Sequence, residues 1–259
     1  MFYYYDWTMI LLVPVIIFTI YAQTKVSSNY NRYSQVRTAR GITGVQAAQE
    51  IMRANGINVP IEVISGRLTD HYDPSKKVLR LSSAVAEGDS IASVAVAAHE
   101  VGHALQHAEG YVPIKVRGAI IPVVNISSKL AWPAIIVGII IEQTGRIYEG
   151  NLIFTIGIVL FAAVVAFHAV TLPVELNASR RALVQLESLG IVYPEEKRSA
   201  KKVLSAAAMT YLAALAAALM QLISGCMTIF RLKPIYTRLK PIFDTQPEDD
   251  EQKQIVQSL

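Results

Sequence analysis

The stretch "AAHEVGHALQH" (97–107) holds three of the chain's five histidines, and the rest of the sequence is interpreted from it. His99, His103 and His107 follow one another at intervals of four residues, and Glu100 lies beside the first. On an α-helix, residues four apart share a face and lie about 6 Å apart along the axis, so His99 and His103 can bind one zinc ion. Glu100 would point about 100° away, where it can reach a metal-bound water and act as general base without being a ligand.

The surroundings of this motif predict a buried helix. The segment "GDSIASVAVAAHEVGHALQHAEG" (88–110) contains no proline, Asp89 or Ser90 can cap its start, and Gly110 lies just past its end. Apolar neighbours such as Val94 predict burial, and burying unpaired histidines and glutamates is costly. The alternative, a pair of surface histidines on an amphipathic helix, is therefore less favoured.

Two histidines do not complete a catalytic zinc site, which needs a third protein ligand. His107 lies on the same face but about 12 Å from His99 along the axis, so it can bind the same ion only if the helix breaks. It is more simply a residue near the C-terminal dipole of the helix. The better candidate is Glu175 in "TLPVELNASRRALVQLESLG" (171–190), where Pro173 suits a helix start. The alternative for Glu175 is a first-turn glutamate that complements the helix dipole.

The composition predicts a membrane protein. Of 259 residues, 53% are hydrophobic and 17% are charged, and the mean hydropathy is +0.37, too apolar for an ordinary soluble domain. Several spans would leave room for one compact soluble domain. The net charge of +4 fits Lys and Arg that anchor cytoplasmic loops, and we do not interpret it as nucleic-acid binding. The single cysteine, Cys226, excludes an intramolecular disulfide and a thiolate-rich metal site.

Four apolar runs are candidate membrane segments. The first, residues 7–22, follows residues without Lys or Arg, so it predicts a retained signal anchor rather than a cleaved signal peptide. The second, 119–141, contains prolines and is either a broken span or an interfacial helix that leads into a shorter span. The third, 152–170, is long enough to cross. The fourth, 203–230, is rich in alanine and is predicted to span, the alternative being a buried or re-entrant helix.

The predicted fold class is an α-helical integral membrane protein with a small α+β, zincin-like cytoplasmic domain and three to four transmembrane helices. Lys and Arg follow the first and third apolar runs, so the positive-inside rule places the segments after these runs in the cytoplasm and the N-terminus outside. The predicted divisions are the signal anchor (1–24), the cytoplasmic zincin domain (25–117), the transmembrane hairpin (118–170), the cytoplasmic segment with the third ligand (171–202), the apolar helix (203–230) and a polar tail (231–259).

Within the soluble part, short patterns predict one more helix and two strands. Residues 34–58 read as a helix that stops at Gly56, and 60–66 and 76–82 alternate like strands, with a turn over 68–76 between them. We expect the second strand to be an edge that pairs with an extended substrate.

Three segments carry a resemblance that covers almost the whole chain. They are "LTDHYDPSKKVLRLS" (68–82), "VAAHEVGHALQH" (96–107) and "TLPVELNASRRAL" (171–183), and they resemble the bacterial membrane zinc metallopeptidases of the YugP type. More distantly, the chain is similar to the membrane zincins of the heat-shock HtpX type. Those also place a hairpin of two spans between HExxH and a Glu-x-x-Ala-Asp element that supplies the third ligand.

The resemblance implies a ligand set and a location. His99, His103 and Glu175 would bind one Zn²⁺ per chain, and Glu100 would be the catalytic acid and base. Together with the topology predicted from the positive-inside rule, the resemblance makes the chain a multi-pass protein of the bacterial plasma membrane with its active site facing the cytoplasm.

The resemblance also raises the question of which residues support the ligands. Ser179 stands where the HtpX-type element has Asp, so a carboxylate is missing there, and Asn177 or Arg180 is expected to take over part of its role. His71 lies in a polar cluster that is either a plain turn or the rim of the active site. Tyr211 is a candidate for the oxyanion donor that zincins need.

The function predicted from these residues is a zinc endopeptidase that cleaves a membrane protein, or a chain lying on the membrane surface, in a cytosolic segment. The alternative is a non-catalytic, zinc-stabilised membrane scaffold, which would keep both histidines but would not need Glu100. Cleavage within the membrane would require HExxH inside a continuous apolar span, and the polar sequences on both sides of 97–107 argue against that.

Overall fold

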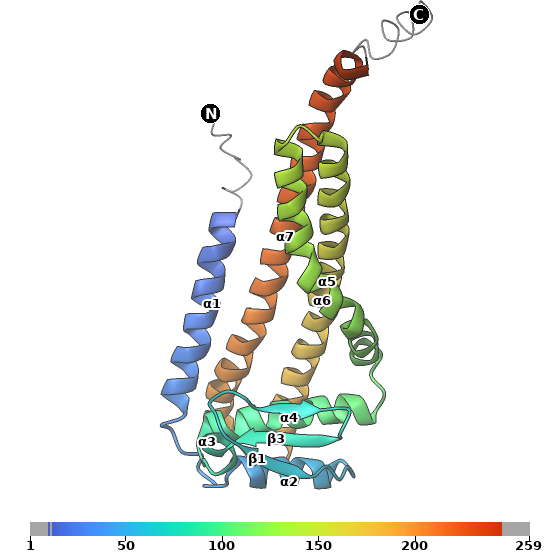
Figure 1. Ribbon diagram of the computed structural model, residues 1–259. Helices are drawn as coiled ribbons and strands as arrows, with labels where there is room; N and C mark the ends of the chain where they lie inside the picture. The colour runs from blue at the N-terminus through green and yellow to red at the C-terminus, as the bar shows by residue number, and fades with distance from the viewer. Residues whose placement is uncertain (1–9, 11, 245–259) are drawn as a thin grey trace, which may run out of the picture.

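The computed structural model describes residues 10 and 12–244 and is mainly helical, with one small sheet at one end of a group of long helices (Figure 1). Its elements are α1 (Leu12–Tyr33), α2 (Gly44–Ala54), β1 (Ile61–Ile64), β2 (His71–Asp73), β3 (Val78–Ser82), α3 (Ser83–Ala86), α4 (Ile91–Ala108), α5 (Val112–Gln143), α6 (Ile147–Ser188) and α7 (Pro194–Asp244). Residues 1–9 and 11, which include the start of the first apolar run, and residues 245–259 of the predicted tail lie outside the described residues.

The three strands form a mixed sheet in the order β1-β3-β2. β1 pairs with β3 in parallel, and β2 pairs with β3 in antiparallel orientation. Two expectations were therefore wrong: the segment predicted as a turn contains β2, and β3 is the central strand rather than an edge. The physical reason is burial, since Leu79 and Leu81 are fully buried and Val78 and Ser82 on the opposite face are buried as well. A strand covered on both faces is suited to the middle of a sheet.

Helix α2 packs on α4 and forms the core of the sheet-bearing end with it. It begins later than predicted, because the Thr43 side chain accepts from the Gln46 backbone N–H and the Gln46 side chain accepts from the Thr43 backbone N–H. It ends at the predicted place, where Gly56 adopts a φ of +65°. Ala48 and Ile51, on its inner face, are fully buried.

Helix α4 is the predicted HExxH helix. Ser90 is its N-cap and accepts a hydrogen bond from the Ser93 backbone N–H, whereas Asp89 forms an ion pair with Arg37 instead. Gly110 follows its end with a φ of +68°. Nearly every residue of α4 before the motif is buried, which agrees with the predicted core helix.

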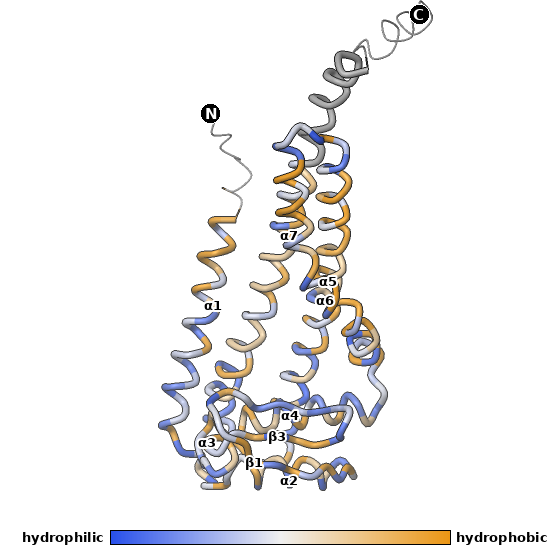
Figure 2. The backbone as a smooth tube through the Cα atoms, in the orientation of Figure 1, coloured by the Kyte–Doolittle hydropathy of each residue, from blue (hydrophilic) through white to orange (hydrophobic). Residues whose placement is uncertain are grey.

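Within the described part of the chain, three helices are long and apolar enough to cross a membrane: α5, α6 and α7 up to Thr228. Most of their apolar windows are not buried inside the molecule. Figure 2 shows hydrophobic stretches along α5 and α6 away from the sheet and more hydrophilic residues at the sheet-bearing end. The second apolar region is one helix, which continues through Pro122 and Pro133. Apolar surface of this kind suits contact with lipid, which supports a membrane protein.

Helix α6 is longer than the sequence predicted. It runs without interruption through Pro173, where we expected a new helix to begin, so Glu175 lies in the interior of α6 rather than in a first turn. Proline is tolerated in membrane helices because neighbouring groups can satisfy the backbone carbonyl it leaves free. Likewise α7 includes residues 194–202 and extends to Asp244, through the first part of the predicted tail. Glu175 is therefore attached rigidly to the helical hairpin of α5 and α6.

Helices α4 and α6 cross at Gly102. A Cβ atom on Gly102 would lie 2.7 Å from the backbone oxygen of Ala178, closer than such atoms approach in proteins. The absence of a side chain thus allows the two backbones to come into contact. This crossing decides which residues of α6 face the HExxH motif.

Candidate metal centre

The crossing of α4 and α6 brings His99, His103 and Glu175 together. Their ligand atoms all lie within 4.8 Å of one another, the one such group of His, Cys, Asp or Glu among the described residues. Glu175 Oε2 is 3.3 Å from His99 Nε2 and 3.4 Å from His103 Nε2. His107, one turn further along α4, is not part of the group.

This group fits a zinc ion in chemistry and in spacing. Two imidazole nitrogens and one carboxylate oxygen are a ligand set of catalytic zinc sites. Two atoms that each lie about 2.0–2.1 Å from zinc at a tetrahedral angle are about 3.3 Å apart, which matches both separations from Glu175. The Glu175 side chain is only 2% exposed, and a carboxylate so buried needs a cation or strong hydrogen bonds beside it.

The electrostatics of the centre also favour a cation. Burial raises the pKa of Glu100, although the nearby His99 and His103 oppose this shift. Burial lowers the pKa of His103, but its hydrogen bond to Glu175 and the charge of Glu100 outweigh burial and hold that pKa above its usual value. A site that draws a proton onto a buried histidine is one in which positive charge is stabilised.

Glu100 is next to the group but outside it. Its Oε2 atom accepts a hydrogen bond of 3.1 Å from the backbone N–H of Tyr72 on β2. It lines the same pocket of about 260 Å³ as the three ligands. Glu100 thus lies beside the three candidate ligands without joining them.

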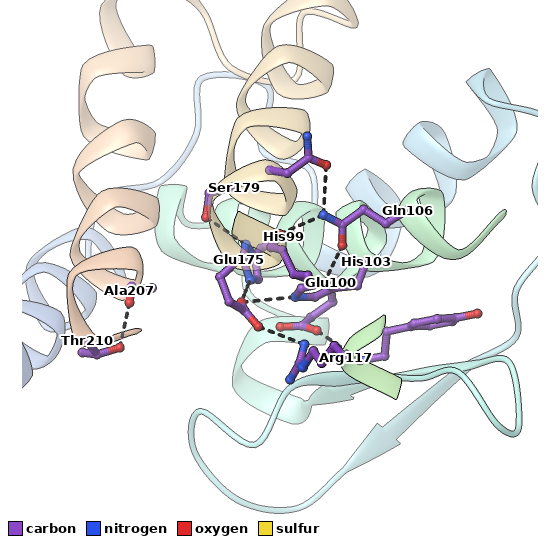
Figure 3. A network of polar contacts seen from close by, with 12 residues as sticks. His99, Glu100, His103, Gln106, Arg117, Glu175, Ser179, Ala207 and Thr210 are labelled. Atoms are coloured by element: carbon purple, nitrogen blue, oxygen red, sulfur yellow. Dashed lines mark hydrogen bonds and ion pairs between the residues drawn. The ribbon is translucent and has the colours of Figure 1, made fainter. Parts of the chain in front are cut away.

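Each of the three ligands has a polar neighbour on its outer side (Figure 3). Ser179 Oγ is 3.2 Å from His99 Nδ1, Gln106 Oε1 is 3.0 Å from His103 Nδ1, and Arg117 Nη1 donates to Glu175 Oε1 at 3.1 Å. Sequence reasoning named Ser179 but missed Gln106 and Arg117. The position of Gln106, three residues after His103 on the helix, was a signal that could have found it, whereas nothing local indicates Arg117.

The remaining predicted residues are placed as follows. Tyr211 of α7 and His71 of β2 line the pocket. The His71 side chain contacts the Thr69 carbonyl oxygen and Arg80 rather than the ligands. The polar cluster around His71 is thus both a strand of the sheet and part of the pocket wall.

Asn177, Arg180 and His107 do not touch the three ligands. Asn177 Oδ1 accepts from Gln106, and Arg180 is exposed and lines a separate surface pocket with Glu109. His107 Nδ1 is 3.2 Å from the hydroxyl of Tyr72. Of these three, only Asn177 is connected to the metal centre, and it is connected through Gln106.

Comparisons with known proteins agree with this geometry. A family model described as "Putative neutral zinc metallopeptidase" matches residues 8–230. The chain belongs to this family. It is also 44% identical to the "Putative membrane protease YugP" of Bacillus subtilis (strain 168). The 210 aligned residues cover 81% of this chain and 90% of that protein. No solved structure was found to match. The resemblance to metallopeptidases of the YugP type is thereby confirmed. The family description and the long apolar helices support a zinc metallopeptidase of the membrane.

Proposed function

We propose that the chain is an integral membrane zinc endopeptidase in which Glu100 is the general base. The observation that carries this proposal is the position of Glu100, in one pocket with the three candidate ligands and held by the Tyr72 backbone N–H. A zinc-stabilised scaffold would need the ligands but would have no use for a carboxylate kept beside them in an accessible pocket. This contrast favours the enzyme over the scaffold.

The residues support a division of chemical tasks. A zinc ion bound by His99, His103 and Glu175 would polarise the scissile carbonyl and lower the pKa of a bound water towards about 7. Glu100 removes a proton from the water that attacks the carbonyl carbon and later delivers it to the leaving amide nitrogen. Tyr211, which reaches the same pocket from α7, is our candidate donor to the developing oxyanion.

The walls of the pocket favour a substrate at the membrane. Ile114, Gly118 and Ile121 line it from the first turns of α5, and Tyr211 lines it from α7, both of which are candidate spans. The substrate we propose is a membrane protein, or a polypeptide lying on the membrane surface. Because β3 is central, the edge available for an extended substrate beside Glu100 is β2.

We place this activity on the cytoplasmic side of the plasma membrane. The basic residues that follow the first and third apolar runs lie near the sheet-bearing end of the long helices, whereas the α5–α6 turn lies at the opposite end (Figure 1). Positive charge near the ends of spans favours the cytoplasm.

The variant Glu100→Gln tests the proposal. Gln can still accept from the Tyr72 N–H but cannot take a proton, so purified Glu100→Gln should bind zinc like the wild type and lose at least about 10²-fold in casein cleavage. Glu50→Gln is the matched control, since Glu50 pairs with Arg40 on the surface. Wild-type activity in Glu100→Gln would show that another group is the base. A wild-type chain that binds zinc and cleaves nothing would favour the scaffold.

A further inference from the structure

Gln106 is a buried amide between a candidate metal ligand and α6. Its side chain is fully buried, and both ends make hydrogen bonds. Gln106 Nε2 donates to the Val174 backbone oxygen at 2.8 Å and to Asn177 Oδ1 at 2.9 Å. Gln106 Oε1 is 3.0 Å from His103 Nδ1. Three polar contacts of this quality on one buried side chain indicate a specific role.

The direction of these hydrogen bonds follows from the chemistry of the partners. A backbone carbonyl such as that of Val174 can only accept, so it must face the NH₂ group of Gln106. The orientation of the second partner, the amide of Asn177, is set by Arg181. Arg181 Nε donates to Asn177 Oδ1 at 2.7 Å, and a guanidinium has no acceptor, so the atom of Asn177 that faces Gln106 is its oxygen. Both bonds to α6 therefore require the amide nitrogen of Gln106, which leaves its oxygen for His103.

The outer end of this network lies at the surface. Arg181 Nη1 forms an ion pair of 2.7 Å with Glu109, which lies just past the end of α4. Arg181 is thereby held with its Nε directed at Asn177. The series runs from Glu109 through Arg181, Asn177 and Gln106 to His103. Its carboxylate can only accept and its guanidinium can only donate, so these two groups keep their roles and the guanidinium orients the amides that follow it.

The consequence concerns the proton of His103. A carbonyl oxygen can only accept, so His103 must carry a proton on Nδ1. Its Nε2, 3.4 Å from Glu175 Oε2, donates to that carboxylate when the ring is cationic and offers its lone pair to a metal when the ring is neutral. We propose that Gln106 is a positioning residue that fixes the tautomer and the ring orientation of His103 for metal binding. His99 has no equivalent, because its neighbour Ser179 can either donate or accept. The proposal rests on the proposed function only in taking His103 as a zinc ligand.

Two substitutions separate this role from a merely structural one. Gln106→Met removes every polar contact at nearly the same length, while Gln106→Glu keeps an acceptor for His103 but loses both donors to α6. Both variants should lower the thermal stability of the purified chain, because the Val174 carbonyl oxygen and Asn177 Oδ1 on α6 lose their donor in both. Only Gln106→Met should weaken zinc binding, by about 10- to 100-fold in competition with a chromophoric chelator, as loss of a ligand's hydrogen-bond partner typically does. Gln106→Glu should stay within a few-fold of the wild type.

Gln185→Met is the matched control for these variants. Gln185 is half-buried on α6, and its Nε2 donates to Asn55 Oδ1 at 3.2 Å, in no contact with the three candidate ligands, so its loss should leave zinc binding unchanged. A second readout needs no metal. In the zinc-free chain with ¹⁵N-labelled histidine, at a pH where the histidines are neutral, the His103 signal should report Nδ1–H. In Gln106→Met the Nε2–H form should appear as well.

The outcomes that overturn the proposal are distinct. Equal loss of zinc affinity in Gln106→Met and Gln106→Glu would show that Gln106 only stabilises the fold, and unchanged affinity and tautomer in Gln106→Met would show that it positions nothing. If neither variant folds, the zinc-free wild-type chain decides through its histidine signals. A neutral His103 that carries its proton on Nε2 rather than on Nδ1 refutes the proposal. Neither readout uses proteolysis, so a wild-type chain that binds zinc without cleaving casein would refute the proposed function alone.

Discussion

Ser179 is in contact with a candidate metal ligand and is placed to tune it. Its hydroxyl lies 3.2 Å from His99 Nδ1, where the HtpX-type element has a carboxylate. A carboxylate makes the bound imidazole a stronger ligand than a neutral hydroxyl does. We predict that Ser179→Ala weakens zinc binding by about tenfold and that Ser179→Asp strengthens it, measured by chelator competition. Ser188→Ala, at an exposed position on the same helix, should change nothing. Equal affinities in the wild type and in Ser179→Ala would contradict this role.

At the scale of residues, local spacing was enough to predict part of the candidate metal centre. His99, Glu100 and His103 lie on one helix, so helical geometry alone relates them. Glu175 was found because its residue type is right and its segment resembles a known element. The contacts of Tyr72 with Glu100 and of Arg117 with Glu175 could not be predicted, because they arise only through the tertiary packing of β2 and α5.

At the scale of elements, the crossing of α4 and α6 sets the geometry of the centre, and Gly102 is where it can be tested. Replacing Gly by Ala in a helix normally stabilises it by about 0.8–1.0 kcal/mol. At Gly102 the sign should reverse, because a Cβ would lie 2.7 Å from the Ala178 oxygen and would push Glu175 away from the histidines. We predict a net destabilisation of about 1–3 kcal/mol in thermal unfolding, together with weaker zinc binding.

Gly118→Ala is the control for this prediction. A Cβ on Gly118 of α5 would meet no atom within 4 Å, so this variant should be neutral or slightly more stable and should bind zinc normally. Were Gly102→Ala as stable as the wild type, α4 and α6 would not be in the close contact described above.

The elements themselves were only partly predictable. α4 was predicted nearly to its ends because its caps and its apolar pattern agree. We predicted a new helix at Pro173, because proline usually starts or breaks a helix and nothing local indicates that α6 continues through it. β2 has only three residues, His71–Asp73, among turn-forming neighbours, so pairing with β3 rather than its own sequence makes it a strand.

At the scale of the whole molecule, the long helices relate the candidate centre to the membrane. With Cys226 replaced, a cysteine at Thr144, in the exposed α5–α6 turn, should react with an impermeant thiol reagent added outside intact cells. A cysteine at Ser83, exposed at the start of α3, should react only after the membrane is opened. The reverse pattern of labelling would place the centre outside the cytoplasm.

The same architecture explains why the candidate centre depends on the intact chain. His99 and Glu175 are separated by 76 residues, and the α5–α6 hairpin lies between them. Because α6 is continuous, the hairpin and the third candidate ligand form one rigid part. The central claim is therefore that Glu175, and not the nearer His107, completes the zinc site.

The zinc content of two single variants tests this claim most directly. Glu175→Ala removes the buried carboxylate that lies 3.3 and 3.4 Å from the two histidines, so it should lower zinc affinity by orders of magnitude. His107→Ala removes a histidine whose contact is the Tyr72 hydroxyl, so the purified variant should retain one zinc ion per chain. If His107→Ala loses its zinc and Glu175→Ala keeps it, the site is not the one formed where α4 crosses α6.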